Sequence, residues 1–258
     1  CIRDRAEAGG ISCSFNATIT DRTVAEIPEM VRWSQQYADI VHTMVFILFR
    51  SPDLTGEFDM VVNGERVDFG DTYKNPEWGG AESLMAPDAA EKIREADPLY
   101  EPCAYLNGTA RPDSLKWLLA NRIVHEGEIL GYMTPRIMEI IQTATHLFTG
   151  TYLAYATPAS TARGKLTATV GSLIDTGMWP SLFRLVKSII KKPKSFLRPA
   201  YVQSMMIIQP VNFEEDGRQD MCDSCPDITV HEGKLVWSCR LEELNQFGAF
   251  VTTTPKKD

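Results

Sequence analysis

Three of the six cysteines in this 258-residue chain stand together near its C-terminal end, and their spacing restricts how that region can fold. Cys222 and Cys225 form a C-x2-C pair, and Cys239 follows after thirteen intervening residues. A C-x2-C pair lets two thiolates from one tight turn bind a single metal centre, whereas the third thiolate must come from a segment that folds back on that turn. The spacing therefore predicts a small metal-binding region built on a chain reversal.

A chain reversal of this kind is predicted between the second and third cysteines. Ile228–His231 and Lys234–Trp237 are typical of two short strands, and Glu232-Gly233 between them is a hairpin signal in which glycine supplies a positive φ. We expect this hairpin to carry Cys239 back toward the other two cysteines. Three thiolates at this spacing suit an iron–sulfur cluster or a tetrahedral zinc ion, each of which needs a fourth ligand.

The fourth ligand is not evident from the local sequence. Cys103 is the best remote candidate, and His231 is a weaker one, because a lone histidine more often has a structural role. Cys13 falls in a predicted strand, where we expect it to be packed. Ordinary buried cysteines are an alternative, but Asp, Ser and Pro around the C-x2-C pair argue against it. A disulfide is disfavoured too, since the chain is not small and shows no secretory segment.

Composition and charge argue against several classes of protein. With 44% apolar and 23% charged residues, the chain has the balance of an ordinary globular protein of one or two domains. Its net charge of −8 argues against nucleic-acid binding, which needs a basic surface. No run reaches the roughly 20 apolar residues of a membrane span, so we expect a cytoplasmic protein without a transmembrane segment. The chain opens at Cys1 rather than at a methionine, and we expect it to be cut on its N-terminal side.

Residues 1–50 predict one β–α–β unit. Ile11–Thr20 is typical of a strand, and Thr23 with Glu26 forms a capping-box pattern that opens a helix of about four turns. Ile40–Phe49 is apolar and rich in strand-forming residues, as in strands that are buried on both faces of a parallel sheet. Strand, helix and strand in this order indicate parallel pairing through a right-handed crossover.

This unit resembles the late β/α units of radical S-adenosylmethionine (SAM) enzymes, in which a strand carrying an asparagine precedes a helix with a Glu-Ile-Pro motif. The matching residues are Phe15, Asn16, Ala17, Thr18, Ile19, Glu26, Ile27, Pro28, Met30, Val31 and Trp33, followed by the strand Val45–Arg50. Many radical SAM enzymes also carry an auxiliary iron–sulfur site near the C-terminus, built from a glycine-bearing hairpin and a C-x2-C pair. There the hairpin usually precedes the pair, whereas in this chain it follows.

The resemblance implies an α/β fold: the C-terminal part of a partial (β/α) barrel, a mostly helical region, and a small cysteine-rich β-hairpin region that binds a cluster. The implied boundaries are residues 1–50 for the barrel portion, 51–199 for the insertion and helical region, and 200–258 for the auxiliary metal-cluster region. The first cluster of the family is bound by a C-x3-C-x2-C loop, a motif that these 258 residues lack. We therefore expect that loop upstream of Cys1, and we expect the chain by itself to be inactive.

The resemblance also implies cofactors, partners and site residues. In the family, a reduced 4Fe–4S cluster passes an electron from a flavodoxin or ferredoxin to SAM, and the resulting 5′-deoxyadenosyl radical abstracts hydrogen from an unreactive C–H bond. Asn16 is the residue that we expect to contact SAM, with Thr18 and Arg50 as further candidates. The auxiliary cluster would take its ligands from Cys222, Cys225, Cys239 and Cys103.

The middle of the chain offers further local signals. Phe58–Val62 and Glu65–Phe69 flank Asn63-Gly64, the strongest short hairpin signal, and Ala86–Ala96 predicts a short helix after them. An insertion of this length after a barrel strand either contributes to substrate binding or is a solvent-exposed excursion.

Further elements follow in order along the chain. The apolar spacing of Asp113–His125 predicts a helix, Thr134-Pro135 opens another, and Ser160–Thr176 is weakly helical. Tyr201–Ile208 is typical of a buried strand that leads into the cysteine region, and Glu242–Gln246 predicts a final helical turn.

Pro180–Lys194 predicts a basic amphipathic helix, with apolar residues opposite five lysine and arginine residues. Such a helix could lie on an anionic membrane or line the path of a lipid-like substrate. The alternative, which we favour, is a surface helix whose apolar side covers the core and whose cations lie near its negative C-terminal end. Peripheral membrane association and a lipid or isoprenoid substrate remain open on this reading.

Two functions follow from the sequence. The first is the C-terminal part of a radical SAM enzyme that acts on an unknown substrate. The second is a non-enzymatic zinc-binding interaction module, in which the three cysteines and a fourth ligand form a structural clip. The identity of the metal discriminates between them. The sequence identifies no catalytic acid, base or radical-bearing residue.

Overall fold

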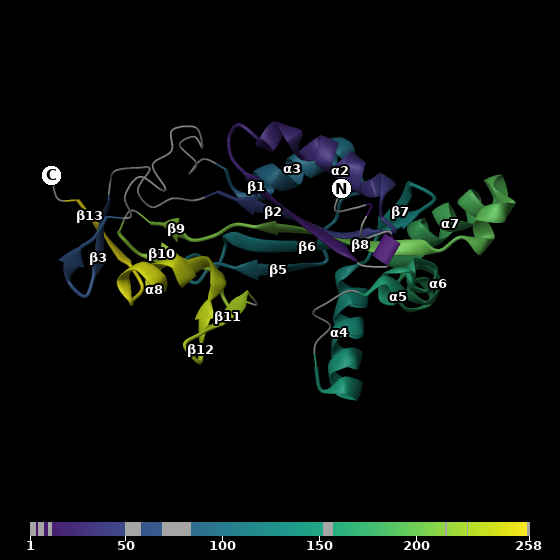
Figure 1. Cartoon of the computed structure of the whole chain (residues 1–258). Coiled ribbons are helices and arrows are strands. Elements are labelled where there is room, and N and C mark those ends of the chain that lie inside the picture. Colours follow the sequence, from purple (N-terminus) through teal and green to yellow (C-terminus); the bar gives the residue numbers. More distant parts are fainter. Residues whose placement is uncertain are drawn as a thin grey trace.

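A six-stranded mixed sheet runs through the molecule, and helices lie on its faces and toward both of its ends (Figure 1). The computed structural model describes residues 4, 8–9, 12–49, 58–68, 84–151, 157–214, 216–225 and 227–256. The strand order is β1-β2-β8-β6-β5, with β7 paired to β6. In that order the strands are Cys13–Ile19, Val41–Leu48, Ala200–Ile208, Leu115–His125, Ala104–Asn107 and Glu128–Tyr132.

The predicted N-terminal β–α–β unit is present. β1 and β2 pair in parallel, and α2 (Ile27–Gln36) connects them. The predicted capping box at Thr23 is wrong: its hydroxyl accepts a hydrogen bond from the Thr20 N–H at 2.9 Å and makes no cap to the helix. A 3-10 turn, η1 (Val24–Glu26), leads into α2 in its place, because the tight turn after β1 aims the Thr23 side chain backward.

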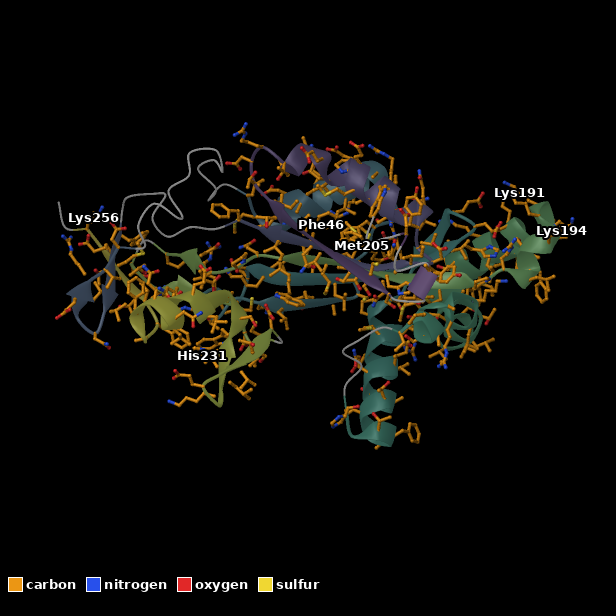
Figure 2. The ribbon with its side chains drawn as sticks, viewed as in Figure 1. Phe46, Lys191, Lys194, Met205, His231 and Lys256 are labelled. Carbon is orange, nitrogen blue, oxygen red and sulfur yellow. The ribbon has the colours of Figure 1, made fainter. Side chains whose placement is uncertain are left out.

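The strand β8 joins this unit from far along the chain and runs parallel to β2, as expected for a buried strand over Tyr201–Ile208. One face of the resulting sheet is covered by α2 and by α3 (Ala86–Ala96), whose predicted bounds are confirmed (Figure 1). Phe46 and Met205, labelled in Figure 2, are fully buried in the core between this face and the two helices.

The predicted helix over Asp113–His125 is wrong, because this segment is the long central strand β6. It runs antiparallel to β8 and also pairs with β5 and β7. Its apolar residues fit helical spacing, yet every position from Ala120 to His125 is buried because sheet partners and helices surround the strand. Even Arg122 is fully buried, where it donates to the side chains of Gln203 at 2.7 Å and Ser34 at 2.9 Å. Tertiary packing therefore overrides the local pattern.

The other face of the sheet carries a set of helices from residues 135–197, gathered toward one end of the molecule (Figure 1). The predicted helix at Thr134-Pro135 is confirmed as α4, and the weakly helical Ser160–Thr176 forms parts of α5 and α6. These elements are α4 (Pro135–Thr149), α5 (Pro158–Thr161), α6 (Gly164–Ile174), η4 (Thr176–Met178), α7 (Trp179–Lys191) and η5 (Pro193–Leu197). Every helix in the described part of the chain is too short or too polar to cross a lipid bilayer.

The opposite end of the molecule is built from the C-terminal residues (Figure 1). Two short antiparallel pairs come first, followed by η6 (Ser238–Arg240) and α8 (Leu241–Phe247). The last strand pairs with the predicted hairpin at Asn63-Gly64, so residues from the predicted second and third regions share one small sheet. The strands of this end are β9 (Asn212–Phe213), β10 (Gln219–Asp220), β11 (Ile228–His231), β12 (Lys234–Trp237), β3 (Phe58–Val62), β4 (Glu65–Arg66) and β13 (Thr252–Pro255).

Candidate functional site

The C-x2-C pair lies in a tight turn just after β10. Ser224, between the two cysteines, has a left-handed backbone with φ 55°, which reverses the chain within the motif. The Cys222 and Cys225 side chains are hydrogen-bonded to each other as a result. Both thiols are partly exposed at the protein surface.

This turn is attached to the edge of the large sheet, beyond the end of β5. Cys222 forms an antiparallel bridge with Gly108, and the Asp223 N–H donates to the Asn107 carbonyl at 2.9 Å. The Thr109 N–H donates to the Met221 carbonyl at 2.8 Å. The thiols therefore have a fixed position relative to the sheet.

A buried ion pair next to the turn also fixes the turn to the edge of the sheet. Asp220 and Lys116 lie 3.0 Å apart, and neither side chain has any exposed surface. The Asp220 carboxylate also accepts hydrogen bonds from the N–H groups of Ala110 and Arg111, each at 2.9 Å, and from the Ser114 hydroxyl at 2.7 Å. Burial acts to raise the pKa of Asp220, but the hydrogen bonds and the Lys116 charge outweigh it and leave that pKa below its usual range.

The β11–β12 hairpin predicted from the sequence is present, and Cys239 follows its second strand. Glu232 and Gly233 both have positive φ, of 48° and 77°, which matches the tight turn expected there. At the open end of the hairpin, the Ser238 N–H donates to the Asp227 carbonyl at 3.1 Å. Cys239 therefore comes directly after the point where the two strands meet again, close to Cys225.

The three thiols influence one another electrostatically. The hydrogen bond with Cys225 is the main cause that raises the pKa of Cys222, with burial and the charges of Cys225 and Cys239 adding to it. The same hydrogen bond lowers the pKa of Cys225 to about 7. Burial and then the Cys225 charge raise the pKa of Cys239 to about 11. One thiolate is thus favoured near neutral pH, and its two neighbours retain their protons.

The donor set has the chemistry of a metal site, but its side chains are not arranged as one. Within the described ranges, no three or more His, Cys, Asp or Glu side chains form a group that could hold a metal ion. Cys222 and Cys225 are in contact, whereas Cys239 acts on Cys225 through its charge. The charge of Asp227 acts to raise the pKa of Cys225 and of Cys239. The sequence analysis did not propose Asp227 as a ligand. Binding a metal would require a shift of Cys239 toward the other two thiols.

The two remote ligand candidates lie apart from the three thiols. Cys103 is buried at the start of β5, where the Asn121 amide donates to its sulfur at 3.6 Å. Gly108, beside Cys222, is five residues further along extended chain, or about 17 Å away. His231 pairs with Lys234 beside the hairpin turn, about 10 Å from the base of the hairpin. Cys13 is packed in β1 against Ile40, as expected.

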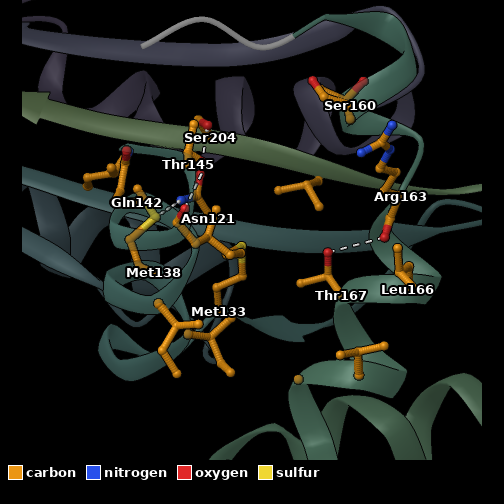
Figure 3. A pocket seen from close by; sticks show the side chains of 18 of the residues that line it. Asn121, Met133, Met138, Gln142, Thr145, Ser160, Arg163, Leu166, Thr167 and Ser204 are labelled. Atoms are coloured by element: carbon orange, nitrogen blue, oxygen red, sulfur yellow. Dashed lines mark hydrogen bonds between the residues drawn. The ribbon is translucent and has the colours of Figure 1, made fainter. Parts of the chain in front are cut away.

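The second candidate site is a cavity of about 550 Å³ between the sheet and helices α4 and α6 (Figure 3). Its floor is polar at one point, where the Ser204 hydroxyl donates to the Asn121 side-chain oxygen at 2.7 Å. The Asn121 amide in turn donates to the Met138 sulfur at 3.6 Å. Most of the wall is apolar and includes Met133, Ile137, Ile141, Leu166, Val170, Ile174, Val202 and Met206. The rest of the lining is polar and includes Thr43, Gln142, Thr145, Ser160, Thr161, Arg163 and Thr167. Volume and lining are those of a site for a mainly apolar ligand that carries polar groups.

Asn16 and Thr18 lie on the same face of the sheet as this cavity. Phe15, one residue before Asn16, packs on Trp33 of α2 with ring centroids 5.3 Å apart, so Asn16 points to the face opposite α2. Asn16 is aligned with Val45 of β2, and Val45 with Met206 of β8, which lines the cavity. Two strand spacings, about 10 Å, separate Asn16 from Met206. Both Asn16 and Thr18 are exposed, and Arg50 lies outside the described residues.

Sequence reasoning missed the ion pair of Lys116 with Asp220 and the polar floor at Asn121. Lys116 and Asn121 are inside the segment that was predicted as a helix, so their positions in a sheet could not be anticipated. The one available signal was Glu126-Gly127, which follows β6 and has two positive φ values, 52° and 76°. It is a hairpin turn of the same kind as Glu232-Gly233.

Comparison with known proteins adds no relative: no family model, no curated protein and no solved structure matches this chain.

Proposed function

We propose that this chain is the C-terminal part of a radical SAM enzyme, in which Cys222, Cys225 and Cys239 bind an auxiliary iron–sulfur cluster. The observation that carries the proposal is the common location of the thiols and of the ends of the parallel strands. β1, β2 and β8 are parallel and end at Ile19, Leu48 and Ile208. The Gln209 N–H, just after β8, donates to the Lys116 carbonyl at 2.7 Å, and the Lys116 charge acts on Cys222.

Ligands of α/β sheets bind beyond the carboxyl ends of parallel strands, because the loops that follow those strands converge there. The thiols lie at this edge, and the neighbouring sheet face carries Asn16, Thr18 and the cavity. In the proposal, β1 and β2 belong to the barrel portion of residues 1–50, and β8 extends their parallel sheet from the third region. Helices α2 and α3 cover one face of this sheet, and the opposite face receives SAM and substrate. The antiparallel strands β5, β6 and β7 belong to the region that follows the barrel.

The proposal gives each group of residues a different role. The cluster, when bound, would supply electron transfer or an open iron for substrate. The thiols hold it, and the Asp220–Lys116 ion pair positions the turn that carries two of them. Asn16 offers both a donor and an acceptor to the polar groups of SAM. No step of the reaction is assigned to a residue of this chain.

A zinc-binding interaction module is the second candidate. It is favoured by the local geometry of the turn and hairpin, since zinc sites often combine a C-x2-C turn with ligands from a neighbouring hairpin. Asp227 or an external group would complete four ligands. In that case the thiols stabilise the C-terminal end of the molecule, and the cavity has a function of its own.

The identity of the metal separates the two proposals. The chain is expressed and purified without oxygen, and iron, acid-labile sulfide and zinc are measured. Iron with matching sulfide, and a brown chromophore that bleaches in air, is the result expected for the enzyme. Zinc at one equivalent without iron supports the module. The parent coding sequence provides a second test, because the enzyme requires a C-x3-C-x2-C motif ahead of Cys1.

A further inference from the structure

Helix α6 is oriented with its small residues inward and its large apolar residues outward. Its buried positions are Gly164, Ala168, Gly171 and Ser172. Leu166, Val170 and Leu173 are exposed, and Leu173 retains 86% of its surface. A helix that covers a core has the reverse arrangement, because burial of large apolar side chains is what stabilises it.

Helix α7 confirms only in part the expectation that its apolar side would cover the core: Leu185 is buried and Ile189 packs against the same core cluster, but other large apolar side chains point outward. Ser181 and Ser188 are buried beside Leu185, and the Ser188 hydroxyl lies 3.3 Å from the His125 ring nitrogen. A β-carbon at Gly131 would overlap the Ser181 hydroxyl, so this polar side fits closely against β7. The side that remains outward carries Trp179, Phe183, Val186 and Ile190.

Two further segments expose apolar side chains, one of them at the tip of α4, which projects away from the sheet (Figure 1). The last turn of α4 exposes Leu147 and Phe148, the latter to 84%. Exposed Phe196 and Leu197 in η5 follow α7. We call the outward apolar side chains of α4, α6, α7 and η5 the apolar face. Large apolar side chains exposed in this number on neighbouring helices mark an interaction site.

The charge around the apolar face is opposite in sign to that of the whole protein. Residues 157–200 contain eight lysines and arginines and one carboxylate, whereas the chain has a net charge of −8. Lys191 and Lys194, labelled in Figure 2, are exposed near the end of α7 and in η5. Their neighbours in this segment are Arg163, Lys165, Arg184, Lys187, Lys192 and Arg198, and its carboxylate is Asp175.

The mouth of the cavity opens within the apolar face. Ile140, Leu166, Val170 and Ile174 line the cavity, and all four are also exposed at the surface. The side chains labelled in Figure 3 come from α4, from the sheet, and from α5, α6 and the residues between them, where they include the polar Ser160 and Arg163. The cavity thus joins exposed apolar side chains of α4 and α6 to Asn121 and Ser204 on the sheet.

We propose that the apolar face binds the surface of an anionic lipid membrane and that the cavity takes up the apolar chain of a lipid from it. Aromatic and aliphatic side chains flanked by lysines are the combination that seats amphipathic helices in the headgroup region. The cavity mouth then faces the acyl chains, and the polar floor receives a polar group on the lipid. This inference does not depend on the metal chemistry.

A second copy of the chain is a poorer partner for this face. In a two-fold dimer the same patch meets itself, so the cation-rich segments of both copies would come together. Anionic lipid headgroups instead attract each lysine and arginine near the surface. Charge complementarity therefore favours the membrane.

Vesicle sedimentation tests the docking. The chain is mixed with vesicles of phosphatidylcholine, or of phosphatidylcholine with phosphatidylglycerol, at low and high salt. We expect at least tenfold stronger binding to the anionic vesicles, weakened by salt. The double variant F183Q/I190Q should lose at least tenfold in binding to them, and K191Q/K194Q should lose binding to the anionic vesicles in particular. The matched controls are L235Q and K234Q on the β11–β12 hairpin, where Leu235 is 74% exposed, and both should bind like wild type.

Uptake of a chain is tested with cis-parinaric acid, whose fluorescence rises in an apolar site. We expect saturable binding by wild type that Thr167→Trp abolishes, because Thr167 lines the cavity. Thr169→Trp, on the exposed side of the same helix, should bind normally. The proposal is overturned if wild type ignores anionic vesicles, if the hairpin controls lose as much binding as F183Q/I190Q, or if Thr167→Trp binds the fatty acid unchanged. A dimer in light scattering that F183Q/I190Q dissociates would assign the face to a second copy instead.

Discussion

Asp220→Asn should destabilise the protein far more than its small change in shape suggests. The carboxylate accepts hydrogen bonds from two N–H groups and from the Ser114 hydroxyl, and it is the counter-ion of the fully buried Lys116. An amide keeps one acceptor oxygen but replaces the other with a donor that faces the Ser114 hydroxyl and the Lys116 ammonium. The change therefore removes a negative charge from beside a buried positive one.

The magnitude follows from the burial of both partners. Removing one member of a buried ion pair costs about 3–5 kcal/mol, because the other charge stays in a medium that solvates it poorly. Lys116→Met should cost less, because the remaining carboxylate keeps its three hydrogen bonds to neutral donors. The double variant should be less destabilised than the sum of the two single changes.

Urea unfolding followed by circular dichroism measures this loss. With a slope near 2.5 kcal/mol/M, the midpoint for Asp220→Asn should fall by about 1–2 M. The matched control is Asp216→Asn, four residues earlier. Asp216 also pairs with a cation, Arg218 at 2.6 Å, but both side chains are more than half exposed, and its midpoint should stay at the wild-type value.

Two results would refute this reasoning. If Asp220→Asn unfolds at the wild-type midpoint, the ion pair does not stabilise the edge of the sheet. If Asp216→Asn falls as far as Asp220→Asn, burial is not the cause of the loss.

Two further predictions rest on other parts of the structure. Gly108→Ala should lower the free energy of unfolding by about 1–3 kcal/mol in the same assay, because its β-carbon would overlap the Asp220 carboxylate. An unchanged midpoint would show that the segments carrying Gly108 and Asp220 are less closely packed. His42 is buried, which lowers its pKa, and its ring nitrogens lie 2.7 Å from the Ser12 hydroxyl and 3.0 Å from the Asp39 carbonyl. The His42 ring therefore binds a proton more readily in the unfolded chain than in the folded one. Its contribution to the free energy of unfolding is fully present above about pH 6.5 and is lost as pH falls through the lower folded pKa. Wild type should lose more stability than His42→Gln between pH 7 and 5, and parallel pH profiles would contradict this.

The sequence predicted the elements whose signals are local. The helix Ala86–Ala96 has its predicted bounds, and the hairpins at Asn63-Gly64 and Glu232-Gly233 have the positive φ values that their turn residues favour. Parallel pairing of β1 with β2 followed from the order of strand, helix and strand. In each case the residues that decide the structure lie within a few positions of one another, or within one β–α–β unit.

The elements that the sequence did not predict depend on distant partners. β6 carries two buried cations whose partners lie elsewhere in the chain. Lys116 pairs with Asp220, and Arg122 lies 3.8 Å from Asp97 and donates to Gln203 and Ser34. The apolar spacing of β6 alone fits a helix. The one local signal for a strand is the two-residue hairpin turn Glu126-Gly127 that follows it. Long-range pairing of this kind is not visible in a single sequence.

The β11–β12 hairpin was predicted from the sequence, whereas the metal site itself stays a prediction. The hairpin brings Cys239 back toward Cys225, but the remote candidate Cys103 lies at the far end of β5, held by Asn121. The outward position of Phe183 and Ile190 on α7 could not be predicted either, because an amphipathic pattern shows that two sides differ and does not show which residues at their border are buried. The buried Ser181 faces β7 because Gly131 leaves room for it there.

The most direct test of the metal centre is the metal content of three chains prepared together without oxygen: wild type, Cys225→Ala and Cys103→Ser. Iron, sulfide and zinc per chain are measured in each. If the three clustered thiols bind one centre, wild type carries metal, Cys225→Ala loses most of it, and Cys103→Ser keeps it, because Cys103 lies about 17 Å from the turn. Full metal content in Cys225→Ala, or an equal loss in Cys103→Ser, would contradict the site proposed for Cys222, Cys225 and Cys239.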